Sequence, residues 1–153
     1  MISLESFLPQ GEEVACTIRE ARTGQLVHAM IITGGPGVGK WTLAESLAAA
    51  LLCRAESGKP CGQCASCRQM VSGTHPDLIS VQKGFPLTPT DTKHSIPLSD
   101  IQETVRLISQ HGFEGDRHVV IIRHAEDLTT QAQNALLKTL RSEEHTSELQ
   151  SRI

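Results

Sequence analysis

The feature that most limits the fold of this chain is a glycine-rich segment between an apolar run and a helical pattern. Residues 34–40 read GGPGVGK, which fits the pattern GxxxxGK. The run HAMIIT at 28–33 before it predicts a buried strand. The segment 41–55 after it has leucines at steps of four with alanines on the same face, and predicts a helix packed on a sheet. This order of strand, loop and helix indicates a P-loop type of α/β fold.

The remaining pattern continues the alternation of helices and strands. Further elements are expected as strands at 77–82 and 118–124, and as helices at 11–23, 98–111 and 129–140. Residues 83–97 contain three prolines and no periodicity, which indicates an exposed loop. We therefore expect a parallel sheet of about three strands with flanking helices.

Composition and charge exclude several classes of protein. The chain has 153 residues, of which 39% are hydrophobic and 20% charged, as in a soluble globular domain. Its formal net charge of -3 is not that of a basic nucleic-acid clamp. The longest apolar stretch, 47–53, is far shorter than the roughly 20 residues that span a bilayer, and the N-terminus lacks a signal-peptide pattern. We therefore expect a cytoplasmic protein without membrane partners, whose thiols stay reduced.

The glycine-rich segment has the composition of a loop that binds phosphate. Its glycines let backbone N–H groups approach phosphate oxygens, and the following helix presents its positive end to them. Lys40 would reach the β- and γ-phosphates of a nucleotide. The residues assigned to nucleotide binding are Gly34, Gly35, Gly37, Val38, Gly39, Lys40, Trp41 and Thr42. The alternative is a glycine turn with no ligand.

The position after Lys40 departs from the P-loop pattern. A P-loop carries Ser or Thr there, and its hydroxyl holds Mg²⁺. This chain has Trp41, and an indole offers only an N–H donor. Thr42 comes one residue late, which on a helix turns its side chain by about 100°. We therefore expect nucleotide binding to be possible in principle, with the placement of magnesium impaired.

Four cysteines follow the expected helix with the spacing of a metal site. Cys53, Cys61, Cys64 and Cys67 are spaced C-x7-C-x2-C-x2-C, which suits a closed tetrahedral shell of structural Zn²⁺. The alternatives are a redox pair at Cys61 and Cys64, an iron–sulfur cluster, and unrelated buried cysteines. The remaining cysteine, Cys16, is expected to be a small buried apolar residue of the first helix.

Taken together, these motifs resemble one family. The residues that carry the resemblance are His28-Ala29, the loop ending in Lys40, the leucine–alanine helix ending in Cys53, the cluster Cys61-x2-Cys64-x2-Cys67, GTHPD at 73–77 and NALLKTL at 134–140. In this order they are similar to the first domain of bacterial DNA polymerase III clamp-loader subunits. The resemblance implies an AAA+ sheet with an inserted zinc module at 53–67.

The resemblance also gives meaning to the end of the third expected strand. Arg123 and His124 stand where an AAA+ ATPase of this family would carry Asp-Glu, and an arginine cannot bind Mg²⁺. Trp41 and Arg123 thus both fall on metal-support positions, which favours the delta-prime type of subunit over the gamma/tau type. The implied function is DNA replication, as a subunit of the polymerase holoenzyme that has no catalytic residues and no ATPase activity of its own. It would help to load the sliding clamp onto primed DNA, with gamma/tau and delta subunits as partners.

Two alternatives to this function stay open. One is an active gamma/tau-type ATPase subunit that tolerates Trp41. The other is a zinc-dependent nucleic-acid-binding module, for which only Arg54, Lys59 and Arg68 lie near the cysteines.

Several polar residues in the motifs are expected to be structural. His124 is interpreted as a surface histidine rather than a base, and Glu126 and Asp127 as loop acids or a helix cap. His75 and Asp77 are interpreted as loop residues before the second strand, with Pro76 between them.

The C-terminal residues need a separate interpretation. Residues 141–151, RSEEHTSELQS, resemble the translation of a sequencing-adapter oligonucleotide. We therefore predict that 141–153 is an artefactual tail and that 1–140 is a truncated AAA+ domain. The alternative is a polar helix end in solvent. In the resembled fold, further strands flank 28–33 on both sides, and we expect a chain without them to be at best marginally stable.

Overall fold

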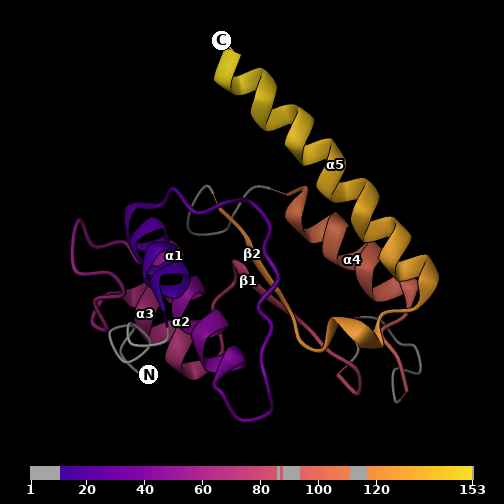
Figure 1. The fold of residues 1–153 in the computed structure, drawn as a ribbon, viewed down its shortest axis with the longest axis horizontal. Helices are drawn as coiled ribbons and strands as arrows, with labels where there is room; N and C mark the ends of the chain where they lie inside the picture. The colour runs from indigo at the N-terminus through magenta and orange to yellow at the C-terminus, as the bar shows by residue number, and fades with distance from the viewer. Residues whose placement is uncertain (1–10, 86, 88–93, 111–116, 153) are drawn as a thin grey trace. The chain divides into compact units, whose positions relative to one another are not determined.

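The computed structural model of the chain describes residues 11–85, 87, 94–110 and 117–152, with side chains described as far as Ser142 (Figure 1). In chain order, the elements are α1 (Glu12–Thr23), α2 (Lys40–Leu52), α3 (Ala65–Ser72), β1 (Leu78–Val81), α4 (Leu98–Ile108), β2 (Val119–Ile122), the short 3-10 helix η2 (Ala125–Asp127) and α5 (Thr130–Arg152). The described residues form two compact units, with boundaries between Leu78 and Ile79 and between Ile121 and Ile122.

The core of the first unit lies between α1 and α2. Ile18 and Ala21 of α1 are fully buried and cluster with Leu43, Leu47 and Ala50 of α2. Alanine fills this face of α2 because its small side chain lets the neighbouring helix approach closely. The predicted helices at 11–23 and 41–55 are confirmed, with ends that differ from the prediction by at most three residues.

The prediction of a strand at 28–33 is wrong. These residues form neither strand nor helix, and Ile31 is 86% exposed. Within 28–33, Ile32 packs against the core of α1 and α2, and so does Leu26 just before this stretch. Among the described residues the sheet consists of β1 and β2, so the apolar run has no strand to pair with. A strand needs a neighbour because its backbone groups must be hydrogen-bonded before they can be buried.

The two other predicted strands are confirmed and form a parallel pair. The N–H of Val119 donates to the carbonyl of Asp77 at 2.9 Å, and the N–H of Arg123 donates to that of Val81 at 2.9 Å. Both strands advance four residues between these bonds, so they run in the same direction. The α/β class and the parallel pairing are therefore correct, but the described sheet has two strands where about three were expected.

The second unit is built around α4 and α5, which pack against each other (Figure 1). The helix predicted at 98–111 is confirmed as α4, where Ile101 is fully buried. The loop predicted at 83–97 lies partly outside the described residues. Its end bridges to the chain before α5, since the N–H of Ile96 donates to the carbonyl of Asp127 at 2.7 Å and the N–H of Thr129 donates to that of Ile96 at 3.1 Å.

The helix predicted at 129–140 is the first part of α5, which continues to Arg152. The tail predicted to be foreign is therefore helical in its backbone as far as that residue, and its origin stays a prediction. Within the part of the chain that the structure describes, no helix combines the length and the apolar character needed to cross a bilayer.

Candidate metal centre and phosphate loop

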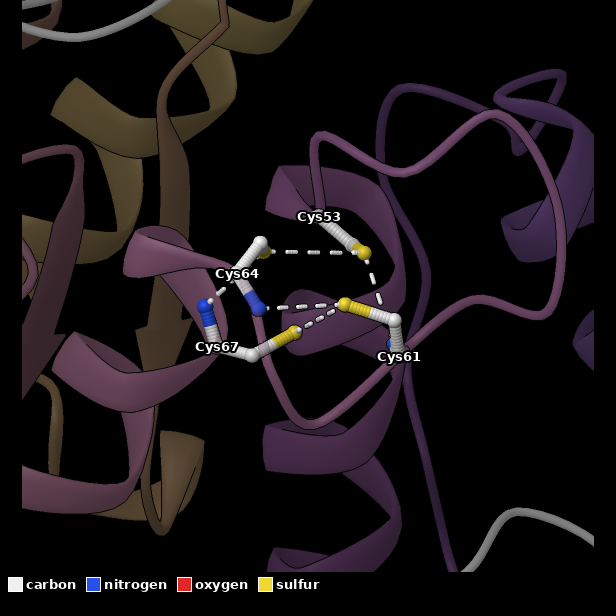
Figure 2. A group of neighbouring side chains, drawn as sticks. All are labelled: Cys53, Cys61, Cys64 and Cys67. Atoms are coloured by element: carbon white, nitrogen blue, oxygen red, sulfur yellow. Dashed lines mark hydrogen bonds between the residues drawn. The ribbon is translucent and has the colours of Figure 1, made fainter.

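The four cysteines of the predicted metal site come together around the end of α2 and the start of α3. Cys53 directly follows α2, Cys64 is the residue that caps the N-terminus of α3, and Cys67 lies in the first turn of α3. Cys61 comes from the loop between these helices, and all four side chains converge in Figure 2. Cys53 and Cys67 are buried, whereas Cys61 and Cys64 are half-buried.

The distances between the sulfurs fit a single tetrahedral ion. All four Sγ atoms lie within 4.8 Å of one another, and the pairs Cys53–Cys64 and Cys61–Cys67 are each separated by 3.9 Å. Zinc–sulfur bonds of about 2.3 Å in a tetrahedron place the sulfurs about 3.8 Å apart. A disulfide needs about 2.05 Å, so the cluster has the spacing of metal ligands. The four cysteines could hold a metal ion.

Backbone N–H groups point at the sulfurs of the cluster. The N–H of Cys61 donates to the sulfur of Cys53 at 3.4 Å, and the N–H groups of Gln63 and Cys64 donate to the sulfur of Cys61 at 3.4 and 3.3 Å. The N–H of Cys67 donates to the sulfur of Cys64 at 3.4 Å. Hydrogen bonds to a charged sulfur favour its ionised form, which is the form that binds metal.

The thiol pKa values follow from these bonds and from burial. Burial raises the pKa of Cys64, but N–H donors from Arg54 and Cys67 more than offset it and lower that pKa to about 6. The N–H groups of Gln63 and Cys64 lower the pKa of Cys61. Burial raises the pKa of Cys67 to about 12. Adjacent thiolates repel one another, so a divalent cation is the group that would allow all of them to ionise together.

The fifth cysteine, Cys16, lies on α1 and outside the cluster. It was expected to be buried, but it is exposed, and its sulfur lies 3.7 Å from Oε1 of Glu20 one turn later. The prediction failed because this position lies next to the buried stripe of Ala15 and Ile18 without belonging to it.

The predicted phosphate loop, residues 34–40, lies at the other end of α2. Gly37 and Gly39 have φ angles of 76° and 91°, and residues other than glycine rarely adopt this backbone conformation. Gly39 caps α2, and its carbonyl accepts from the N–H of Leu43 at 2.9 Å. Gly34 also lies close to a side chain, because a Cβ there would meet Cγ2 of Val38 at 3.0 Å. The loop conformation therefore depends on the glycines that the motif requires.

The lysine of this loop is held by the loop itself. Nζ of Lys40 donates to the carbonyls of Gly34 and Gly35 at 2.5 and 3.0 Å. Trp41 and Thr42 follow in the first turn of α2, and both are half-buried. Since both belong to the helix, the hydroxyl of Thr42 is turned by about 100° from the Trp41 position.

The predicted substitutes for acidic metal ligands lie at the end of β2 and just beyond it. Arg123 is exposed, and His124 has a φ of 58° with its Nδ1 lying 3.3 Å from Oε1 of Glu126. Asp127 lies 3.5 Å from Nζ of Lys83. His124 and Glu126 are exposed, as expected for a surface histidine and a solvated acid, whereas Asp127 is half-buried and lies in the 3-10 helix η2.

His75 and Asp77 are buried and belong to a polar network rather than to the cysteine cluster. The N–H of Asp77 donates to Nδ1 of His75 at 3.0 Å, and Nε2 of His75 lies 2.8 Å from Oγ of Ser66. Oδ1 of Asp77 lies 3.6 Å from Nδ1 of His118. The structural interpretation of His75 and Asp77 agrees with these contacts.

Sequence reasoning missed two residues near the cysteine cluster. Ser66 is fully buried between two of the cysteines, and only its place inside the C-x2-C motif hinted at a role. Arg22 of α1 donates from Nε to the carbonyl of Lys59 at 3.1 Å, which adds a fourth cation to those counted near the cysteines. No sequence signal links Arg22 to a loop that lies 37 residues away.

Comparisons with known proteins agree with the motifs. The family described as DNA polymerase III, delta subunit, matches residues 10–148. DNA polymerase III subunit delta' of Yersinia pestis is 40% identical over 119 residues, which are 77% of this chain and 33% of that protein. Subunit delta' of Pseudomonas aeruginosa is 38% identical over 117 residues, which are 76% of this chain and 34% of that protein.

A related subunit type is also similar, at lower identity. DNA polymerase III subunit tau of Escherichia coli is 33% identical over 118 residues, which are 76% of this chain and 17% of that protein. The chain spans about a third of the length of the delta' proteins it matches.

Proposed function

Because the chain belongs to the DNA polymerase III delta subunit family, we propose that it is part of a delta-prime subunit that helps to load the sliding clamp onto primed DNA without hydrolysing ATP. The higher identity to delta' proteins than to a tau protein supports this assignment. The partners would be the gamma/tau and delta subunits of the clamp loader. The fold of the whole domain would be of the AAA+ type, with residues 1–140 as its first part.

One observation carries the proposal that the subunit does not hydrolyse ATP. The residue directly after the phosphate-loop lysine is Trp41, which supplies no oxygen for Mg²⁺. Thr42 does not replace it, since it lies one position further along α2. The second departure, Arg123 in place of an acid, supports the same conclusion by its chemistry alone. The subunit would act through its shape and its contacts with neighbouring subunits.

Magnesium-dependent ATP turnover by the purified full-length protein tests this proposal. We expect turnover far below about 1 s⁻¹, the low end of ordinary enzyme rates. A gamma/tau subunit assayed in parallel is the positive control. Turnover near 1 s⁻¹ that depends on Lys40 would instead favour the alternative of an active gamma/tau-type ATPase, to which the similarity to tau gives some support.

The metal would be a structural Zn²⁺ held by Cys53, Cys61, Cys64 and Cys67. Four sulfurs leave no open position for a substrate, and a closed thiolate shell is typical of structural zinc. When bound, the ion would supply charge that holds the thiols ionised and join the end of α2 to the start of α3. Elemental analysis of the protein purified without added metal is the test. We expect one zinc per chain, and iron with sulfide would contradict the proposal.

A further inference from the structure

Cys53 lies apart in sequence from the other three cysteines of the candidate metal centre, so its distance from them has to be set by contacts in the fold. Cys61, Cys64 and Cys67 lie close together along the chain, and local N–H···S bonds order them. Cys53 is separated from Cys61 by a loop in which residues 56–58 are exposed. Across this loop the N–H of Cys61 reaches the sulfur of Cys53 at 3.4 Å. A loop of this kind holds its ends together only weakly, so a shorter bond between the two helices would help to set the distance between the two parts of the site.

Ser66 makes that contact without being a ligand. It lies between Cys64 and Cys67 on α3, and its hydroxyl donates to the carbonyl of Leu52 at 2.7 Å. Leu52 is the residue directly before Cys53 and the last of α2. The bond therefore joins the helix that presents Cys53 to the helix that presents the other two cysteines, and it lies in the interior, since Ser66 is fully buried.

The direction of each bond around Ser66 is determined by its neighbours. Nδ1 of His75 accepts from the N–H of Asp77, so the ring proton is on Nε2. Nε2 of His75 lies 2.8 Å from Oγ of Ser66 and donates to it, which leaves the single proton of the hydroxyl to point at Leu52. Asp77 is in turn joined to β2 through its carbonyl, which accepts from Val119 at 2.9 Å.

We propose that Ser66 is the positioning residue of the metal centre, and that His75 orients its hydroxyl so that the carbonyl before Cys53 is held against α3. The inference rests on the proposed zinc site and deepens it. Neither side chain would touch the ion. Their role is to hold Cys53 at the distance from Cys64 and Cys67 that one tetrahedral ion requires, and so to bind the ion more tightly than the four thiols alone would.

The test uses the full chain with Zn²⁺ and Co²⁺ as probes. Zinc affinity is measured by competition with a chromophoric chelator, and Co²⁺ absorption reports the number of sulfur ligands and their geometry. In Ser66→Ala we expect the affinity for zinc to fall about 10- to 100-fold, the usual effect of removing a contact that orients ligands. The Co²⁺ spectrum should keep its sulfur charge-transfer bands, because all four thiols remain, while its d–d bands shift.

The matched control is Ser72→Ala, the same change on the same helix. Ser72 is exposed, and its hydroxyl lies 3.1 Å from the carbonyl of Gln69 and 2.7 Å from Oγ1 of Thr74, so the change should leave the binding of both metals unaffected. His75→Asn keeps an acceptor for the N–H of Asp77 but does not reach Ser66. We expect it to lower zinc affinity by less than Ser66→Ala does, since the bond from Ser66 to Leu52 remains.

The outcomes separate the inference from the proposal beneath it. If the unmodified chain binds neither zinc nor cobalt, the metal site itself is wrong and the role of Ser66 falls with it. If the unmodified chain binds zinc and Ser66→Ala matches Ser72→Ala in affinity and Co²⁺ spectrum, only the role of Ser66 is overturned. Should Ser66→Ala fail to fold in excess zinc, His75→Asn decides, and unchanged affinity and spectrum in that variant would reject the inference.

Discussion

The two ends of α2 differ in whether residues close in sequence supply the contacts that each end needs. At the C-terminal end, the cysteine cluster draws on residues 53–67, and its sulfurs approach to distances that suit one ion. At the N-terminal end, the phosphate loop follows an apolar segment in which Ile31 is 86% exposed and which pairs with neither strand of the described sheet. The same helix therefore begins after a segment that pairs with no strand among the described residues, and it ends at a cluster formed by residues close in sequence.

The difference shows why a metal centre and a strand make different demands on a chain. A metal site with short spacings is closed by local turns and N–H···S bonds. A strand in a parallel sheet depends on neighbours that are distant in sequence. A segment such as 28–33 can thus carry a clear strand pattern and still not form a strand when those neighbours are not beside it.

The largest expected effect concerns the cysteine cluster at the C-terminal end of α2. In Cys67→Ser we expect zinc affinity to fall by roughly a thousandfold, because one of four thiolate ligands and part of the folding energy of the site are lost. The measurement is chelator competition. The control is Cys16→Ser, which should bind zinc normally, because Cys16 lies on α1 outside the cluster. Equal zinc binding in both variants would show that the cluster is not the site.

Amide hydrogen exchange can sharpen the same contrast without any mutation. We expect the amides of residues 30–33 to exchange on the order of a hundredfold faster than those of Ala48, Ala49 and Ala50, which are buried within α2. The reason is that exchange requires opening of a hydrogen bond, and the apolar segment forms no strand. Protection of 30–33 equal to that of α2 would mean that the segment is paired in solution.

Thiol reactivity should divide the cysteine cluster in the chain stripped of metal. At pH 7 we expect Cys64 to be alkylated at least about tenfold faster than Cys67, because only the thiolate reacts. The N–H donors that lower the pKa of Cys64 to about 6 keep it ionised, and its rate should fall as the pH drops through that value. Burial raises the pKa of Cys67 to about 12, so it stays protonated. Mass spectrometry of modified peptides gives both rates, and equal rates would contradict this order.

The smallest effect is expected at the phosphate loop. Trp41→Ser supplies the missing hydroxyl, and we expect Mg²⁺ to increase ATP affinity by no more than a few-fold, since one hydrogen-bonding group contributes modestly. Thr42→Val is the matched variant, and it should change nothing if Thr42 does not serve the metal. Titration of labelled ATP with and without Mg²⁺ measures both. A large loss in Thr42→Val would show that Thr42 holds the ion after all.

Some features were accessible from the sequence because they depend on local chemistry. The spacing of the cysteines, the periodicity of α1 and α2 and the apolar runs of β1 and β2 are each visible within a short stretch of sequence. Cys16 was misjudged because it lies beside an apolar stripe on a short helix, where one position decides exposure. Ser66 could not be singled out, since a serine inside a C-x2-C repeat looks like any spacer until its partner Leu52 is known.

By itself, the sequence determined the α/β class, the family and which four cysteines form the candidate metal site, because residue type and spacing carry that information directly. The tertiary structure alone decided that 28–33 forms no strand and that Ser66 and His75 connect the end of α2 to α3. Both outcomes depend on which backbone groups find partners far along the chain. A buried donor or acceptor is stable only when its partner lies beside it, and a local sequence pattern does not predict which distant group that partner is.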